Sequence, residues 1–234
     1  MTTTPQAVPE YDEAPHATRH GRALGALRAV EARTGVRTRL PLERETAPDA
    51  GLRPVRPEVA ALLPGGGLAP GTTVVVSGST TLLLTLLAAP SRAGAWTAFV
   101  GHPQVGMAAA AEAGCELERT VCVPDPGPDA PAVLAALLDA LDLVVVGPGA
   151  ALLDTDRRRL TARTRERGAV LVVAQDTTRS STTWPGAQVV LAAGPGRWEG
   201  IDHGAGSLCR RTLTVHRTGR GRAARQADLY CVLA

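Results

Sequence analysis

The chain has 234 residues, a formal net charge of +3 and a hydrophobic share of 44%, which suits one sizeable domain and excludes a fully disordered chain. No run of 18 apolar residues predicts a membrane span, and the first residues have neither the basic start nor the apolar core of a secretory signal. We therefore expect a cytoplasmic protein without membrane partners, and association with the nucleoid stays open.

All 25 basic residues are arginines, and the sequence contains no lysine. This excludes mechanisms that need a lysine amine, among them Schiff-base chemistry and a P-loop whose lysine binds phosphate. The four cysteines and five histidines show no metal-ligand spacing. We therefore expect no metal site and no cofactor.

Residues 1–57 are predicted to form a flexible arm. The arm contains one short amphipathic helix at 21–34, in which Leu24, Leu27 and Val30 share a face. A linker that alternates charged residues and prolines follows the helix. Because so short a helix is marginal alone, we expect it to dock on the main domain or on a partner.

Residues 58–234 are predicted to form one α/β domain, because strand-like and helix-like runs alternate. The predicted strands are 72–77, 96–100, 120–123, 142–146 and 169–174, and the predicted helices are 80–89, 104–113, 129–141 and 154–167. After Trp184 the pattern changes to three antiparallel strands, at 187–193, 207–217 and 227–233. The expected fold is a mostly parallel sheet flanked by helices, with antiparallel strands at the C-terminal end.

The bend between the first strand and its helix is the most informative segment. Strand, loop and helix are arranged as in a P-loop, but Gly78, Ser79, Thr80 and Thr81 lead directly into the helix without the second glycine or the lysine. The next arginine, Arg92, would lie about 16 Å away at the far end of the helix. Two interpretations remain, a serine or threonine cap or an anion held at the helix N-terminus, and we favour the cap.

The chain resembles the RecA family of ATP-dependent recombinases over residues 58–232. The lead-in from Gly66 to Gly71 has the family's G-G-L-x-x-G pattern ahead of its phosphate-loop strand. Three later segments resemble the catalytic, metal-binding and nucleotide-sensing segments of the family, and they are 99–107, 142–153 and 170–175. The resemblance implies a RecA-like core.

The same resemblance shows which chemical groups are missing. The position of the family's magnesium-binding aspartate falls on Gly147, and that of its catalytic glutamate falls at or near Pro103, whereas the nucleotide-sensing glutamine is kept as Gln175. The lysine, the aspartate and the glutamate, three groups on which phosphoryl transfer depends, are therefore all absent from these positions. We therefore predict a pseudo-ATPase with no catalytic residues, in which the loop from Gly78 to Thr81 is not functional.

A lysine-free, catalytically stripped chain of this kind is similar to the ImuA-type accessory proteins of actinobacterial SOS mutagenesis, and segments 123–146 and 184–187 add to the similarity. The resemblance implies a scaffold in DNA-damage-induced translesion synthesis. Its implied partners are an ImuB-type inactive Y-family polymerase homologue and an error-prone replicative-type polymerase. Two other functions stay open, a DNA-binding regulator of recombination or repair and a SulA-like inhibitor of cell division.

The arginines form two clusters in the sequence. The cluster at 157–167 is expected to be a solvated helix face, on which Arg159, Arg163 and Arg167 follow i, i+4 spacing. The cluster at 207–225 contains no acidic residue, and it predicts contact with nucleic acid or with an acidic partner. Any binding of DNA is expected to be weak, independent of the DNA sequence and sensitive to salt. The candidate contact residues are Arg179, Arg210, Arg211, Arg217, Arg220, Arg222 and Arg225.

The tryptophans offer little support for base stacking. No aromatic residue is interleaved with the second arginine cluster, so we expect no stacking platform for single strands. Trp184 and Trp198 are expected to anchor their segments on the core. An exposed tryptophan would instead indicate a protein interface.

Overall fold

The computed structural model describes residues 51–175, 184–202 and 205–233. The predicted helix at 21–34 and the candidate contact residue Arg179 lie outside these residues.

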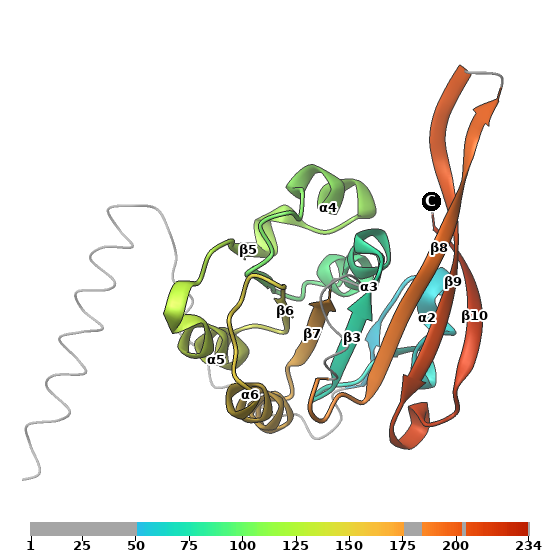
Figure 1. Cartoon of the computed structure of the whole chain (residues 1–234). Coiled ribbons are helices and arrows are strands. Elements are labelled where there is room, and N and C mark those ends of the chain that lie inside the picture. Colours follow the sequence, from blue (N-terminus) through green and yellow to red (C-terminus); the bar gives the residue numbers. More distant parts are fainter. Residues whose placement is uncertain (1–50, 176–183, 203–204, 234) are drawn as a thin grey trace, which may run out of the picture. The chain divides into compact units, whose positions relative to one another are not determined.

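One large sheet organises the described residues, with the strand order β10-β9-β8-β3-β7-β6-β4-β5 (Figure 1). The strands are β3 (Thr73–Ser77), β4 (Thr97–Val100), β5 (Thr120–Val123), β6 (Leu143–Val146), β7 (Val170–Gln175), β8 (Val189–Asp202), β9 (Ala205–Gly219) and β10 (Ala227–Leu233). Strands β8 to β5 pair in parallel, whereas β9 is antiparallel to β8 and β10 is antiparallel to β9. The predicted α/β class, with a mostly parallel sheet and antiparallel C-terminal strands, is confirmed.

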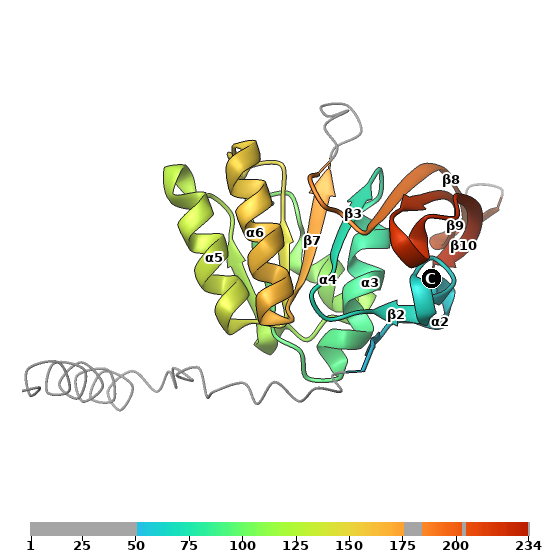
Figure 2. The same ribbon diagram turned by 90° about the horizontal axis from the view of Figure 1, so that it is seen from below.

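Helices cover both faces of this sheet. They are α3 (Thr80–Arg92), α4 (Met107–Ala113), α5 (Ala130–Ala140) and α6 (Asp154–Arg167). Helices α5 and α6 lie side by side (Figure 2) and pack through Leu134 and Leu160 against the face that carries Val75. Helix α3 packs against the other face, which carries Val74 and Val76. Because both faces are buried at the centre of the sheet, β3, β6 and β7 are continuous apolar runs instead of alternating ones.

The end of the predicted linker is part of this unit. Strand β1 (Arg53–Pro54) pairs with β2 (Gly67–Leu68), and α2 (Pro57–Ala60) follows β1. Arg53 also donates a hydrogen bond from Nη2 to Asp142 Oδ1 at 3.0 Å. No helix in the described ranges is long and apolar enough to cross a bilayer.

Several element boundaries differ from the predicted ones for local reasons. Helix α3 continues through the buried Pro90 to Arg92 instead of ending at 89, and Ala93 still donates to Ala89 O at 3.0 Å. Helix α5 begins at Ala130 after a short 3-10 turn, and the side chain of Asp129 makes no capping bond.

Strands β8 and β9 are the largest departure, because they run past the rest of the sheet as a two-stranded ribbon (Figure 1). The sequence around Pro195 has the composition of a turn, which predicts a strand end at 193. In the structure the pairing shifts register between Ala193 and Gly196 and then continues. A bulge of this kind accommodates a proline inside a strand.

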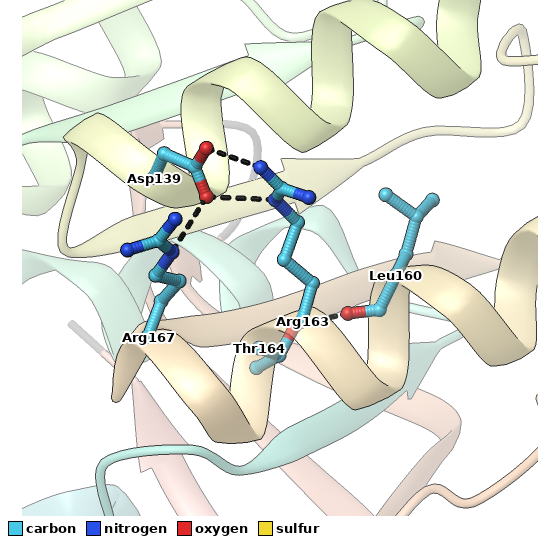
Figure 3. A network of polar contacts seen from close by, with 5 residues as sticks. All are labelled: Asp139, Leu160, Arg163, Thr164 and Arg167. Atoms are coloured by element: carbon cyan, nitrogen blue, oxygen red, sulfur yellow. Dashed lines mark hydrogen bonds and ion pairs between the residues drawn. The ribbon is translucent and has the colours of Figure 1, made fainter. Parts of the chain in front are cut away.

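The first arginine cluster joins two helices instead of forming only a solvated face (Figure 3). Asp139 on α5 accepts hydrogen bonds from both Arg163 Nε at 2.7 Å and Arg167 Nε at 2.9 Å, and Arg163 Nη2 bonds its second oxygen. Arg159 is exposed. The hydrogen bond from Arg163 and the charges of both arginines hold the pKa of Asp139 below its usual value.

The variant Asp139→Asn is expected to unfold at a lower urea concentration at pH 7, since it removes the charge that both arginines share. Because the folded-state pKa is lowered, the carboxylate stabilises the fold above its ordinary pKa of 3.8 and loses this effect as the pH falls through the folded value. The difference between the two urea midpoints should therefore shrink as the pH falls below 3.8. A pH-independent difference would contradict this, and Glu112→Gln on the exposed side of α4 is the control.

Candidate functional site

The loop at the carboxyl end of β3 is built around a helix cap. Gly78 has a left-handed backbone with a φ of 81°, which glycine adopts without strain. Ser79 follows with an extended backbone, and its Oγ accepts a hydrogen bond from Leu82 N at 3.1 Å. Ser79 is therefore the N-cap of α3, as favoured from the sequence, while Thr80 is exposed.

An arginine reaches this loop from a distant part of the chain. Arg211 on β9 donates from Nη1 to Thr81 Oγ1 at 3.3 Å and to Ser79 Oγ at 3.4 Å. Arg92, the arginine closest in sequence after the loop, instead lies next to Gly114. Sequence analysis names Arg211 as a candidate contact residue, but no local signal predicts that it contacts the loop, because 130 residues separate it from Thr81 and only the pairing of β9 with β8 brings it there.

The guanidinium of Arg211 has no carboxylate partner among the described residues. It lies over the ring of Trp198, 5.3 Å from the ring centroid, and its Nε is buried without a hydrogen bond. Trp198 and Arg211 are directly opposed in the β8–β9 pairing. The negative face of the indole ring thus offsets part of the cost of holding a cation beside the positive end of α3.

A cavity of about 240 Å³ lies beside the loop. The loop meets three segments that carry the RecA resemblance there, 99–107, 142–153 and 170–175. The lining residues are Val76, Gly78, Ser79, Thr80, Leu83, His102, Gln104, Pro148, Ala174 and Gln175. This volume is below the 300–1,000 Å³ of ordinary ligand pockets. The lining contains no carboxylate and no arginine, so hydroxyl, amide and imidazole groups supply its polarity.

His102 is the titratable residue of this lining. Burial lowers its pKa, and its Nδ1 has no hydrogen-bond partner in the part of the chain that the structure describes. The imidazole is therefore neutral at pH 7. No group of three or more histidine, cysteine or acidic residues in the described ranges could hold a metal ion.

The segment after β6 leaves no room for a side chain where the resemblance places a metal-binding aspartate. A Cβ atom added at Gly147 would lie 2.4 Å from Gly101 O and 2.5 Å from the Cβ of His102. Two backbone segments approach each other closely here, and Gly147 N donates to Val100 O at 2.8 Å. Gly147 therefore serves close packing between the ends of β6 and β4.

The second arginine cluster extends from the middle of β9 into the connection to β10. Arg210 and Arg220 are ten residues apart, or about 33 Å along an extended strand, so they do not form one surface. Arg211 contacts the loop, whereas Arg217 donates to Ala61 O at 3.1 Å and to Arg225 O at 3.4 Å. The exposed members are Arg210, Arg220 and Arg225, and the side chain of Arg222 lies outside the described ones.

The tryptophans divide between the core and the surface. Trp184 is 4% exposed and donates from Nε1 to Thr161 Oγ1 at 2.9 Å, which confirms that it anchors its segment. Trp198 is 45% exposed, so the same expectation for Trp198 is wrong. It lies on the part of β8 that extends beyond the sheet, where there is no core to cover it.

These features define a class of protein: a mostly parallel α/β domain whose first strand leads through a short capped loop into a buried helix. The family described as the MT3502 N-terminal domain matches residues 61–186, more than half of the chain. The chain belongs to this family.

Two individual proteins are similar to the chain. The "Uncharacterized protein Rv3395c" of Mycobacterium tuberculosis is 41% identical over 135 residues, which cover 56% of this chain and 63% of that relative. The match thus spans less than two thirds of the relative's length. The crystal structure of the RadB recombinase is 19% identical with a TM-score of 0.49, and the alignment covers 74% of this chain and 92% of that one.

The variant Ser79→Ala is expected to lower the free energy of unfolding by about 1 kcal/mol, because α3 loses its cap and Arg211 loses an acceptor. Ser79→Asp retains a capping oxygen and gives Arg211 a carboxylate, so its stability should equal or exceed that of the wild type. Urea unfolding measures both, and Thr80→Ala serves as the control. If Ser79→Asp is as unstable as Ser79→Ala, neither capping nor contact with Arg211 explains the role of Ser79.

Proposed function

We propose that the chain is a non-catalytic RecA-like scaffold in DNA-damage-induced translesion synthesis, which acts through contacts with an ImuB-type polymerase homologue. One observation carries the proposal. The four segments that would form a nucleotide site in a RecA-like protein still converge, but they converge on a small cavity lined by uncharged groups.

Steric closure at Gly147 supports the non-catalytic part of the proposal. An aspartate at this position would require the backbone at Gly101 to move, because even a Cβ would lie 2.4 Å from the Gly101 oxygen. Backbone packing therefore occupies the position at which the resemblance places the metal-binding aspartate, which supports a non-catalytic role. Pro103, at or near the expected place of the glutamate, cannot activate water.

The position of Arg211 argues against magnesium at the loop. In a P-loop, the hydroxyl of the first helical turn binds the metal ion. Here the hydroxyls of Ser79 and Thr81 both accept hydrogen bonds from the Arg211 guanidinium. A divalent cation would have to displace this positive charge or lie beside it, and both are unfavourable.

Exposed apolar side chains on the ribbon supply a surface for a protein partner. Trp198, Ile201 and Leu208 are 45%, 55% and 51% exposed. On the edge strand β10, Tyr230 is 78% exposed. Aromatic and arginine side chains on a projecting element are typical of protein–protein hot spots, which fits a scaffold that works by contact.

The purified chain is expected to hydrolyse ATP no faster than a buffer blank, with or without its partner, because the phosphate-binding lysine, the metal-binding aspartate and the catalytic glutamate are missing from the positions where the resemblance places them. A phosphate-release assay measures this. The idea fails if hydrolysis is detected and Thr81→Ala or Ser79→Ala abolishes it.

Co-expression with the ImuB-type homologue is expected to yield a stoichiometric complex at low salt. The double variant Trp198→Ser/Leu208→Ser should weaken the complex at least about tenfold, as loss of hot-spot contacts does, when measured by titration of the purified proteins. The matched control is Leu117→Ser, which removes a side chain that is 43% exposed elsewhere on the domain. No complex at low salt, or equal weakening by the control, would contradict the proposed function.

A further inference from the structure

Arginines from two separate parts of the chain gather at the amino edge of the sheet. They are Arg165, at the C-terminal end of α6, and Arg217, Arg220 and Arg225, at the connection from β9 to β10, and we call them the basic corner. This edge is opposite the carboxyl edge, where the loop and the cavity lie. The basic corner is therefore a different surface from the site described above.

The segment after Trp184 brings the two sets of arginines together. Arg165 donates from Nη2 to Gly186 O at 3.3 Å, and Arg220 donates from its backbone N to Gln188 O at 2.9 Å. Two residues of backbone span at most about 7 Å. The Arg165 side chain and the Arg220 backbone thus meet the same short segment, which places the two residues close together on one edge of the sheet.

The backbone that carries these arginines is held firmly in place. Gln188 donates from N to Thr73 O at 3.0 Å and accepts from Thr73 N on its own Oε1 at 2.7 Å, which ties it to the start of β3. Arg217 links the β9–β10 connection to Ala61 O and Arg225 O. The arginines therefore project from a preorganised surface, which lowers the entropic cost of binding.

The positive charge of the basic corner is not neutralised by an ion pair within the part of the chain that the structure describes. Residues 203–227 contain no aspartate or glutamate. None of the four arginines forms an ion pair in the described ranges, where Asp228 instead pairs with His216. A polyanion would supply the missing negative charge.

The surroundings favour nucleic acid over an acidic protein. Among the described residues, the large exposed apolar side chains lie on the ribbon and on β10, and the remaining ones are Leu52, Leu117 and Leu153. None of them belongs to the basic corner or to residues 184–188. A protein interface needs an apolar centre, whereas contacts to a phosphate backbone need only fixed cations. We propose that the basic corner binds the phosphate backbone of nucleic acid without reading its sequence.

Fluorescence anisotropy with a labelled 30-base-pair DNA duplex of mixed sequence tests this proposal on the full chain. Three or four phosphate contacts predict a slope of about −3 for the logarithm of the binding constant against the logarithm of salt concentration. The double variant Arg220→Ala/Arg225→Ala should reduce this slope by about 2 and weaken binding at 100 mM salt roughly tenfold or more. Arg165→Ala should reduce the slope by about 1. If the arginines at 217–225 bound DNA by themselves, as a continuous basic segment, this substitution would leave the slope unchanged.

The matched control is Arg197→Ala/Arg210→Ala, which removes two exposed arginines from β8 and β9 at a distance from the basic corner. This control should leave the affinity within about twofold, and Arg220→Lys/Arg225→Lys should retain most of the salt slope. Equal weakening by both alanine pairs, no binding by the wild type, or binding that ignores salt would overturn the proposal.

Displacement of the duplex by polyglutamate at equal charge would also overturn the proposal, in favour of an acidic protein. The alanine pairs should unfold at the wild-type urea midpoint. Because the basic corner does not include the apolar ribbon, Arg220→Ala/Arg225→Ala should still form the complex with the ImuB-type homologue. Failure of DNA binding and failure of the proposed function are thus distinguishable.

Discussion

Strand β3 is the element on which both the loop at Gly78 and the basic corner depend. It pairs in parallel with β7 on one side and with β8 on the other, and its valines are buried in the two separate cores. Such a strand cannot shift by one residue without moving every valine to the wrong face. At its carboxyl end it fixes Gly78 and the cap of α3, and at its amino end Thr73 fixes Gln188.

The contact of Arg211 with the loop is best understood as a balance of two effects. A cation beside the N-terminus of α3 is opposed by the helix dipole at about 0.3–1 kcal/mol. Hydrogen bonds that involve a charged group contribute about 1.5–3 kcal/mol, and Arg211 has two hydroxyl acceptors and an indole ring. The favourable interactions exceed the dipole effect, so the ribbon is attached to the loop by a side chain that needs no bound anion.

Local patterns predicted the order of strands and helices well, because apolar runs, glycines and prolines act over a few residues. The cap at Ser79 was found for the same reason. Arg211 is a candidate contact residue in the sequence, but its contact with the loop is not predictable there, because the pairing of β9 with β8 sets its neighbours and no local pattern reports that register. Trp198 was misjudged for a related reason, since the bulge after Ala193 carries β8 beyond the core.

For the second arginine cluster the difference is the reverse: residues that are close in sequence are far apart in space. Strand geometry separates Arg210, in the middle of β9, from Arg220, just after its end, whereas Arg165 and Arg220 are brought to one edge by a turn from a third element. A five-residue β3 also separates the two edges of the sheet by about 17 Å. The ribbon, where we propose a protein partner, and the basic corner, where we propose nucleic acid, are therefore separate surfaces, and occupation of one would not cover the other.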